Sequence, residues 1–138
     1  MVEIYARKTL KAGRRMVMKS PIKNKINLVF IPVSDVKRAK EWYSKILAIE
    51  EGDDFFEHLF VAKMDGAGLI LDTMPMWRSE DGQIPRLNAP VIQFATDDIA
   101  AAYEFMKANG VELVTDIQHS QFFVFKDPDG NMLMVCGK

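Results

Sequence analysis

Two parts of the chain share one pattern of apolar and polar positions. Each begins with a short apolar run, at residues 26–33 and 90–96, that is rich in residues favouring strands. Each continues with apolar residues at i, i+3 and i+4 spacing, which predicts an amphipathic helix, and then with further short apolar runs. The pattern predicts the same strand–helix–strand–strand–strand order twice.

A fixed offset of 63 residues aligns the two parts. It places Asp35 on Asp98, Phe60 on Phe123 and Lys63 on Lys126, with conservative matches between them. Because one register holds across a strand, a helix and further strands, we interpret the match as a duplicated module. The modules are expected at residues 26–72 and 89–135.

Local signals support these boundaries. Asp35 and Asp98 precede the helical segments, where an acceptor side chain caps the first backbone N–H groups. Asn109-Gly110 ends the second helix, since glycine adopts the left-handed conformation at low cost. Asp127-Pro128-Asp129-Gly130-Asn131 predicts a tight turn between the last two strands.

The rest of the chain divides into two segments outside the modules. Residues 73–88 are polar and rich in proline, which predicts a linker or lid without regular structure. Residues 1–23 form a basic extension, and the first twenty residues lack the apolar core of a signal peptide. We therefore expect one folded domain at residues 24–138.

The doubled module, with VSDVKRAKEWYSKIL in its first half and FKDPDGNMLMV in its second, resembles the vicinal-oxygen-chelate superfamily. This is the glyoxalase, bleomycin-resistance and dioxygenase group, and the resemblance covers about residues 24–137. It implies an α+β fold in which two tandem βαβββ modules form a cupped mixed sheet with helices on the outer face. It also implies a homodimer, because such modules often complete their cups across a two-fold axis.

In that family, chemistry takes place inside the cup. Strand side chains alternate between faces, so residues two apart share one. The ligand-binding residues expected from this alternation, with Trp77 folding over from the linker, are Leu28, Phe30, Leu71, Trp77, Val91, Gln93, Phe122, Val124, Met134 and Cys136. Phe123 and Phe125 alternate with these positions and are expected beneath the helices.

Where relatives bind a metal, the first and last strands of each module supply the ligands. The resemblance maps these positions onto Leu28, Leu71, Val91 and Met134. Catalytic divalent metals prefer imidazole, carboxylate or thiolate ligands, which none of these side chains offers. We therefore expect no metal ligands, no cofactor and no assigned catalytic residues.

The remaining polar residues leave alternatives open. Gln93 either bonds a ligand or makes a hydrogen bond within the core, to backbone or to Thr73. Cys136 has no evident neighbouring base, which favours a packing role over catalysis. His58 and His119 are expected to be surface or structural residues.

The composition of the whole chain limits the classes of binding partner that we expect. A net charge of −1 and a pI near 6.1 favour neither nucleic acid nor an anionic membrane as a partner. No apolar run approaches the ~20 residues needed to span a bilayer. A single cysteine excludes an internal disulfide, which is compatible with a cytoplasmic location.

Three functional hypotheses remain. The first is a metal-independent protein that binds an apolar or aromatic small molecule in the cup. The second is a glyoxalase-like lyase, isomerase or dioxygenase, for which only Asp72, Thr73, Trp77, Gln93 and Cys136 lie near the cup. The third is a regulatory or interaction module that uses its basic N-terminal segment.

Overall fold

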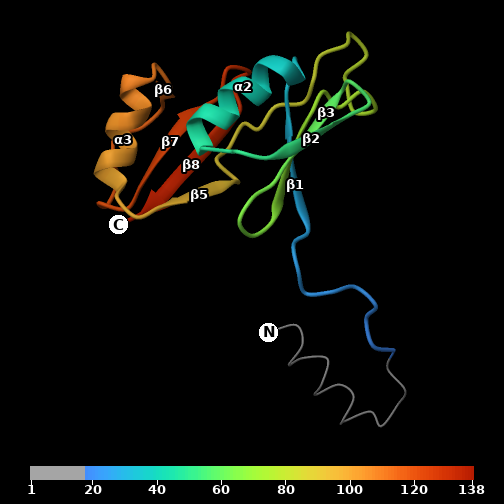
Figure 1. Cartoon of the computed structure of the whole chain (residues 1–138), viewed down its shortest axis with the longest axis horizontal. Coiled ribbons are helices and arrows are strands. Elements are labelled where there is room, and N and C mark those ends of the chain that lie inside the picture. Colours follow the sequence, from blue (N-terminus) through green and yellow to red (C-terminus); the bar gives the residue numbers. More distant parts are fainter. Residues whose placement is uncertain (1–17) are drawn as a thin grey trace.

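The computed structural model describes residues 18–138, so most of the basic extension lies outside the described residues. Residues 18–138 form two four-stranded mixed sheets, each with one helix (Figure 1). The first module comprises β1 (Leu28–Pro32), α2 (Val36–Leu47), β2 (Gly52–Phe55), β3 (Leu59–Ala62) and β4 (Gly68–Asp72). The second comprises β5 (Gln93–Thr96), α3 (Ile99–Ala108), β6 (Glu112–Leu113), β7 (Phe122–Lys126) and β8 (Met132–Gly137).

Both sheets have the same topology. The strand order is β1-β4-β3-β2 in the first sheet and β5-β8-β7-β6 in the second. β1 pairs with β4, and β5 with β8, in parallel, whereas the other pairs are antiparallel. The predicted α+β class and tandem βαβββ order are confirmed. No helix within the described part of the chain is long and apolar enough to cross a membrane.

The helices begin where their acidic caps predict. Asp35 accepts a hydrogen bond from the backbone N of Arg38 at 3.1 Å, and Asp98 accepts one from Ala101 at 2.9 Å. Each cap satisfies one of the N–H groups that a helix start leaves without a partner, worth about 1 kcal/mol. Gly110, with φ of +69°, follows the second helix as the sequence predicts.

The sequence does not single out β2 as a strand. Its residues, Gly-Asp-Asp-Phe, are all exposed and lack the apolar alternation of a half-buried strand. β2 forms because its backbone pairs with β3 at the edge of the sheet, with Asp53 opposite Val61. Pairing with an existing strand here overrides a composition that disfavours strands.

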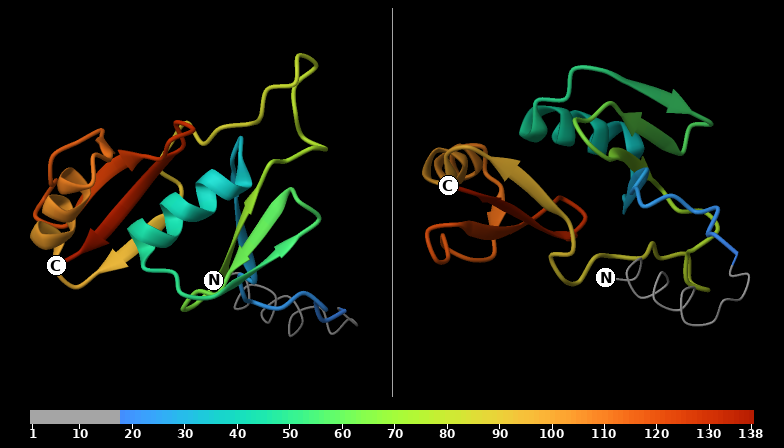
Figure 2. Two further views of the ribbon diagram at one scale, coloured as in Figure 1. Left: turned by 45° about the horizontal axis from the view of Figure 1, so that its top comes forward. Right: turned by 90° about the horizontal axis from the view of Figure 1, so that it is seen from below.

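One hydrophobic core serves both modules. Trp42 of α2 lies with its ring centroid 6.4 Å from that of Phe125 in β7, so the first module's helix also contacts the second sheet (Figure 2). Tyr103 of α3 packs edge-on against Phe123 at 5.2 Å, which confirms that Phe123 and Phe125 lie beneath the helices. The buried strand residues of this core are Ile31, Phe60, Ala62, Leu69, Leu71, Phe123, Phe125, Leu133 and Val135.

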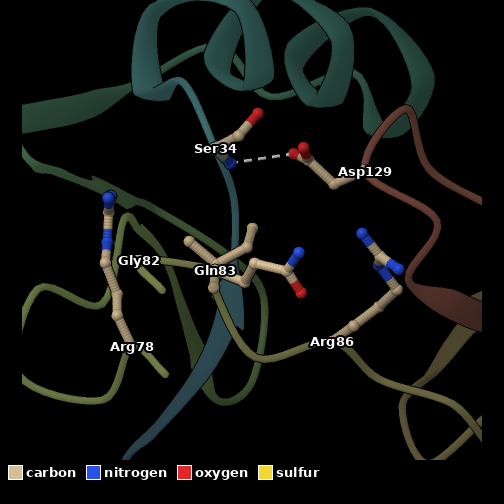
Figure 3. A pocket seen from close by; sticks show the side chains of 7 residues that line it. Ser34, Arg78, Gly82, Gln83, Arg86 and Asp129 are labelled. Atoms are coloured by element: carbon tan, nitrogen blue, oxygen red, sulfur yellow. Dashed lines mark hydrogen bonds between the residues drawn. The ribbon is translucent and has the colours of Figure 1, made fainter. Parts of the chain in front are cut away.

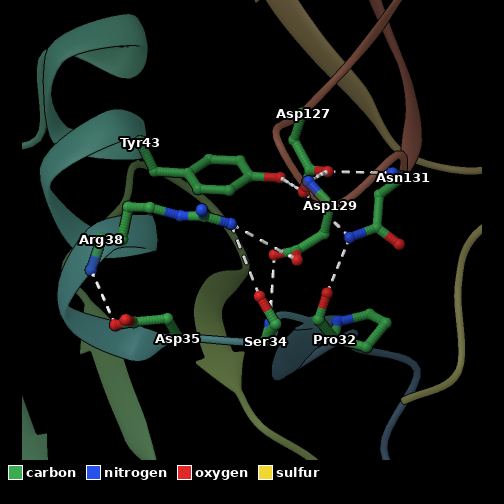
Figure 4. A network of polar contacts seen from close by, with 8 residues as sticks. All are labelled: Pro32, Ser34, Asp35, Arg38, Tyr43, Asp127, Asp129 and Asn131. Atoms are coloured by element: carbon green, nitrogen blue, oxygen red, sulfur yellow. Dashed lines mark hydrogen bonds and ion pairs between the residues drawn. The ribbon is translucent and has the colours of Figure 1, made fainter. Parts of the chain in front are cut away.

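A buried polar network joins the two modules to the linker (Figure 4). The Tyr43 hydroxyl in α2 donates to the Asp127 carboxylate in the second module at 2.5 Å. Asn131 Nδ2 donates to the Pro32 carbonyl at 2.7 Å and to Asp127 at 2.9 Å. Asn131 Oδ1 accepts from the Leu87 backbone N at 2.8 Å. The Asp127–Asn131 turn therefore does more than join β7 to β8. Its side chains also bond the end of β1, α2 and the linker to one another.

The Tyr43–Asp127 contact predicts how stability depends on alkaline pH. Burial, and then the neighbouring Asp127 carboxylate, raise the pKa of Tyr43 well above its ordinary value of 10.0. The folded chain keeps this phenol proton while the unfolded chain loses it, so the stabilisation is complete below pH 10. Above pH 10, this group alone lowers the free energy of unfolding by about 1.4 kcal/mol per pH unit.

Urea unfolding at pH 9 and pH 11 measures this effect. The wild-type chain is expected to lose about 1.4 kcal/mol more between these values than Tyr43→Phe, which has no phenol proton to lose. Comparing the two proteins cancels the titration of the other tyrosines and the lysines. An equal pH dependence in both would contradict the raised pKa.

Candidate functional site

Each sheet has a second face, turned away from the shared core, that we call its cup face. In the first sheet, Phe30 in β1 is opposite Ile70 in β4, and Ile70 is opposite Val61 in β3. Because alternate residues share a face, Leu28 and Leu59 belong to it as well. The first cup face is therefore formed by Leu28, Phe30, Leu59, Val61 and Ile70, with the acidic residues Asp72, opposite Leu59, and Asp53, opposite Val61.

Apart from these two carboxylates this face is apolar, and it is partly open to solvent. Leu28 and Phe30 are 41% and 44% exposed. Ile31, which points to the core face of the same strand, is fully buried. Phe55 of β2, opposite Leu59, is also 44% exposed and extends the apolar surface to the sheet edge. Exposed apolar side chains gathered on one sheet face mark a binding surface rather than packing already completed within the chain.

The second cup face combines apolar, sulfur-containing and amide side chains. β8 places Met134 opposite Gln93 of β5 and opposite Val124 of β7, and it places Cys136 opposite Phe122. The second cup face is therefore formed by Gln93, Phe122, Val124, Met134 and Cys136, and it continues through Ala95, Lys126 and Met132. The chain just before β5 continues this side with Val91, which is 71% exposed.

Gln93 is not buried in the core, and its side chain makes no hydrogen bond to Thr73. Its side chain is exposed, and its Nε2 donates to the thioether sulfur of Met134 at 3.2 Å. A thioether is a weak acceptor, so the amide can exchange this contact for a stronger bond to a ligand. The role of Gln93 in binding a ligand on the second cup face stays a prediction.

The predicted position of Leu71 is wrong. Leu71 is fully buried on the core face, opposite Ile31, and Ile70 occupies the cup-facing position in β4. The turn between β7 and β8 has one residue more than its counterpart in the first module. Ile70 is consequently equivalent to Met134 at an offset of 64, and extending the offset of 63 to the last strand reverses the assigned face.

The linker places Trp77 in a surface turn. Its backbone N donates to the Met74 carbonyl at 3.0 Å, and its side chain is 70% exposed. The described contacts do not bring Trp77 onto either cup face, so its role as a cover for the ligand stays a prediction. Sequence reasoning overlooked Phe55 and Ile70, which alternation along β2 and β4 could have assigned once the pairing was known.

The family comparison supports the fold. A family model described as the Glyoxalase/Bleomycin resistance protein/Dioxygenase superfamily matches residues 25–135. The chain belongs to this superfamily. No match is found among curated protein sequences.

Solved structures of the superfamily have the same fold. A member from Sphaerobacter thermophilus is 24% identical, with a TM-score of 0.66 over 84% of this chain and 98% of that one. An antibiotic-binding protein from Streptomyces sp. CB03234 is 21% identical, with a TM-score of 0.66 over 86% and 98%. A lactoylglutathione lyase from Agrobacterium tumefaciens is 14% identical, with a TM-score of 0.66 over 86% and 96%. At these identities, the likeness establishes the fold and not the activity.

At the metal-ligand positions that the family resemblance assigns, with Ile70 in place of Leu71, this superfamily member carries Leu28, Ile70, Val91 and Met134, none of which is an imidazole, carboxylate or thiolate. Two other potential ligands lie on the cup-facing side of the last strands, Asp72 in β4 and Cys136 in β8. Within residues 18–138, no three His, Cys, Asp or Glu side chains gather to form a metal site.

The two histidines lie beside aromatic residues. The His58 ring stacks on Phe56 with 6.0 Å between centroids, and the His119 ring lies 6.2 Å from Phe122. His119 has φ of +50° in the turn that precedes β7. His119 thus flanks the second cup face through Phe122, and neither histidine forms a pair with a carboxylate among the described residues.

Proposed function

We propose that the chain is a metal-independent binding protein for an apolar or aromatic small molecule held against its cup faces. The observation that carries this proposal is the exposure of Phe30, Leu28 and Val91 on faces whose opposite sides supply the buried strand residues of the core. Covering apolar surface contributes roughly 25 cal/mol per Å², so an apolar molecule gains free energy here. Aromatic rings add favourable stacking on Phe30 and Phe122.

The proposal includes a homodimer that completes each cup. Both cup faces turn away from the core that the two modules share, and one chain leaves each face partly exposed. β1 and β5 are also edge strands whose outer backbone groups have no neighbouring strand within the sheet. A second copy that places its second cup face opposite the first cup face would enclose a ligand between Phe30 and Phe122.

Two further observations support binding over catalysis. The carboxylate of Asp72 is buried and accepts the Met74 backbone N at 2.8 Å, which occupies it structurally. The ion pair on the second cup face joins Lys126 to Glu112 at 3.8 Å, at the opposite edge of the sheet from Gln93. A fold neighbour that is an antibiotic-binding protein is compatible with this function.

The proposal also places the protein in the cytoplasm, where its single cysteine can stay reduced.

Titration with N-phenyl-1-naphthylamine, a neutral aromatic dye, tests the proposal by fluorescence. We expect saturable binding in the presence of a chelator, by a protein that sediments as a dimer. Phe30→Ala and Phe122→Ala are each expected to weaken binding about tenfold, because each removes an aromatic contact worth about 1–2 kcal/mol.

Phe105→Ala is the matched control. Phe105 is also 44% exposed, but it lies on α3, away from both cup faces. Its replacement is expected to leave the dye affinity unchanged. Dye binding that never saturates, or that weakens equally in Phe30→Ala and Phe105→Ala, would contradict the proposed cup. Dye binding that is abolished by the chelator would contradict its metal independence.

A further inference from the structure

A hollow lies between the linker and the start of α2, away from the cup faces (Figure 3). Its volume is about 380 Å³, and it is lined by Ser34, Arg78, Gly82, Gln83, Ile84, Arg86 and Asp129. We propose that this hollow binds a small oxyanion, the phosphate or carboxylate group of a ligand, between the guanidinium groups of Arg78 and Arg86. This site is separate from the cup faces and does not depend on the function proposed for them.

Each arginine is anchored through its own part of the fold. Arg78 Nε donates to the Thr73 carbonyl at 3.1 Å, which fixes its side chain against the end of the first module. The stem of Arg86 packs over Gly130, where an added Cβ would lie 3.3 Å from Arg86 Cδ. The next residue, Leu87, is bonded to the buried Asn131. Both guanidinium groups are thus positioned before a ligand arrives.

The local charges leave these two arginines available. Asp129 is the carboxylate that lines the hollow, and it already accepts the Ser34 backbone N at 3.1 Å and pairs with Arg38 at 3.7 Å. Among residues 18–138, no ion pair within 4.0 Å involves Arg78 or Arg86. The hollow therefore has an excess of positive charge, although the whole chain has a net charge of −1.

The segment between the arginines is held in a defined turn. The Ser79 backbone N donates to the Gln83 carbonyl at 2.9 Å, and the Gln83 backbone N donates to Ser79 Oγ at 3.0 Å. Gly82 has φ of +84°, a conformation that glycine adopts without steric cost. In Figure 3 the Gln83 side chain lies between the two arginines, where its amide can donate a third hydrogen bond to a bound oxyanion.

Oxyanion chemistry follows from the donors that line this hollow. Guanidinium groups bind phosphate and carboxylate through paired, charge-assisted hydrogen bonds, and two of them with one amide match an anion with several oxygens. A hollow of about 380 Å³ is at the lower end of the size range for small-molecule sites. This size suits the anionic end of a small metabolite rather than a protein surface.

Titration of the full-length ¹⁵N-labelled chain with inorganic phosphate at constant ionic strength tests the site by NMR. We expect saturable shifts of the side-chain Nε–H signals of Arg78 and Arg86 and of the backbone amides of residues 78–86. Arg78→Gln and Arg86→Gln are each expected to weaken phosphate binding about tenfold. Asp129→Asn is expected to strengthen it several-fold, because it removes the negative charge that lines the hollow.

Lys107→Gln, which removes a positive charge from the last turn of α3, is the charge-matched control and is expected to bind phosphate as the wild type does. Parallel titrations with acetate and citrate distinguish a carboxylate ligand from a phosphate ligand. Tighter binding of phosphate than of both carboxylates would assign a phosphate group, and the reverse order would assign a carboxylate. Non-saturating shifts over all basic residues, or equal affinity in Arg86→Gln and Lys107→Gln, would overturn the proposal. Dye binding in the cup does not enter this result.

Discussion

Asn131→Ala is expected to lower the free energy of unfolding by about 4 kcal/mol. The side chain is fully buried and takes part in three hydrogen bonds, to the Pro32 carbonyl, the Leu87 backbone N and the Asp127 carboxylate. Alanine removes all three and leaves the buried backbone groups without their partners. Each such group costs about 1–3 kcal/mol, more than the net gain from forming the bond.

Urea unfolding followed by circular dichroism measures this loss as a shift in the midpoint at an unchanged slope. Asn88→Ala is the matched control, because Asn88 is exposed in the linker close to the same network. It is expected to change stability by less than about 0.5 kcal/mol. Similar losses in the two variants would show that the network around Asn131 does not hold the modules together.

Phe125→Ala is expected to lower the free energy of unfolding by about 4 kcal/mol, because it removes a buried apolar side chain from the core. The Phe125 ring is fully buried and lies 6.4 Å from the rings of both Trp42 and Phe123. Removing it leaves a cavity between α2 and the second sheet, and well-packed surroundings collapse into such a cavity only in part. The decrease in the free energy of unfolding therefore has two parts: the lost burial of the ring, and the van der Waals contacts that its neighbours lose around the cavity.

Thermal and urea unfolding of Phe125→Ala should each show one transition, because the two modules share the core that Phe125 occupies. Phe56→Ala makes the same chemical change on a ring that is 81% exposed, and it is expected to cost less than about 1 kcal/mol. Two separate transitions, or a loss for Phe125→Ala as small as that for Phe56→Ala, would contradict the shared core.

Patterns within single segments were enough to predict most of the architecture. The apolar runs, the Asp35 and Asp98 caps and the Asn109-Gly110 stop act over a few residues, so the sequence displays them directly. The repeat added the tandem order, because two weak patterns at one offset support each other. Alternation along β7 then assigned Phe123 and Phe125 correctly to the core face.

The remaining features depend on contacts between segments that lie far apart. The extra residue before β8 is not evident from the repeat alone, and it reversed the face assigned to Leu71. Tyr43 and Asp127 are separated by 84 positions, so their hydrogen bond cannot be read from local spacing. Arg78 and Arg86 lie in a segment without periodicity, and only the folded linker places both beside Asp129.

The shared core has a consequence for how the repeat arose. An isolated first module would expose the α2 surface that carries Trp42, and an isolated second module would expose Phe125 beneath it. Neither half of this chain encloses a complete interior, so the halves form a single folding unit despite their similarity. A single ancestral module would have faced the same exposure. A single module of this kind would therefore need a second copy to cover the same surface.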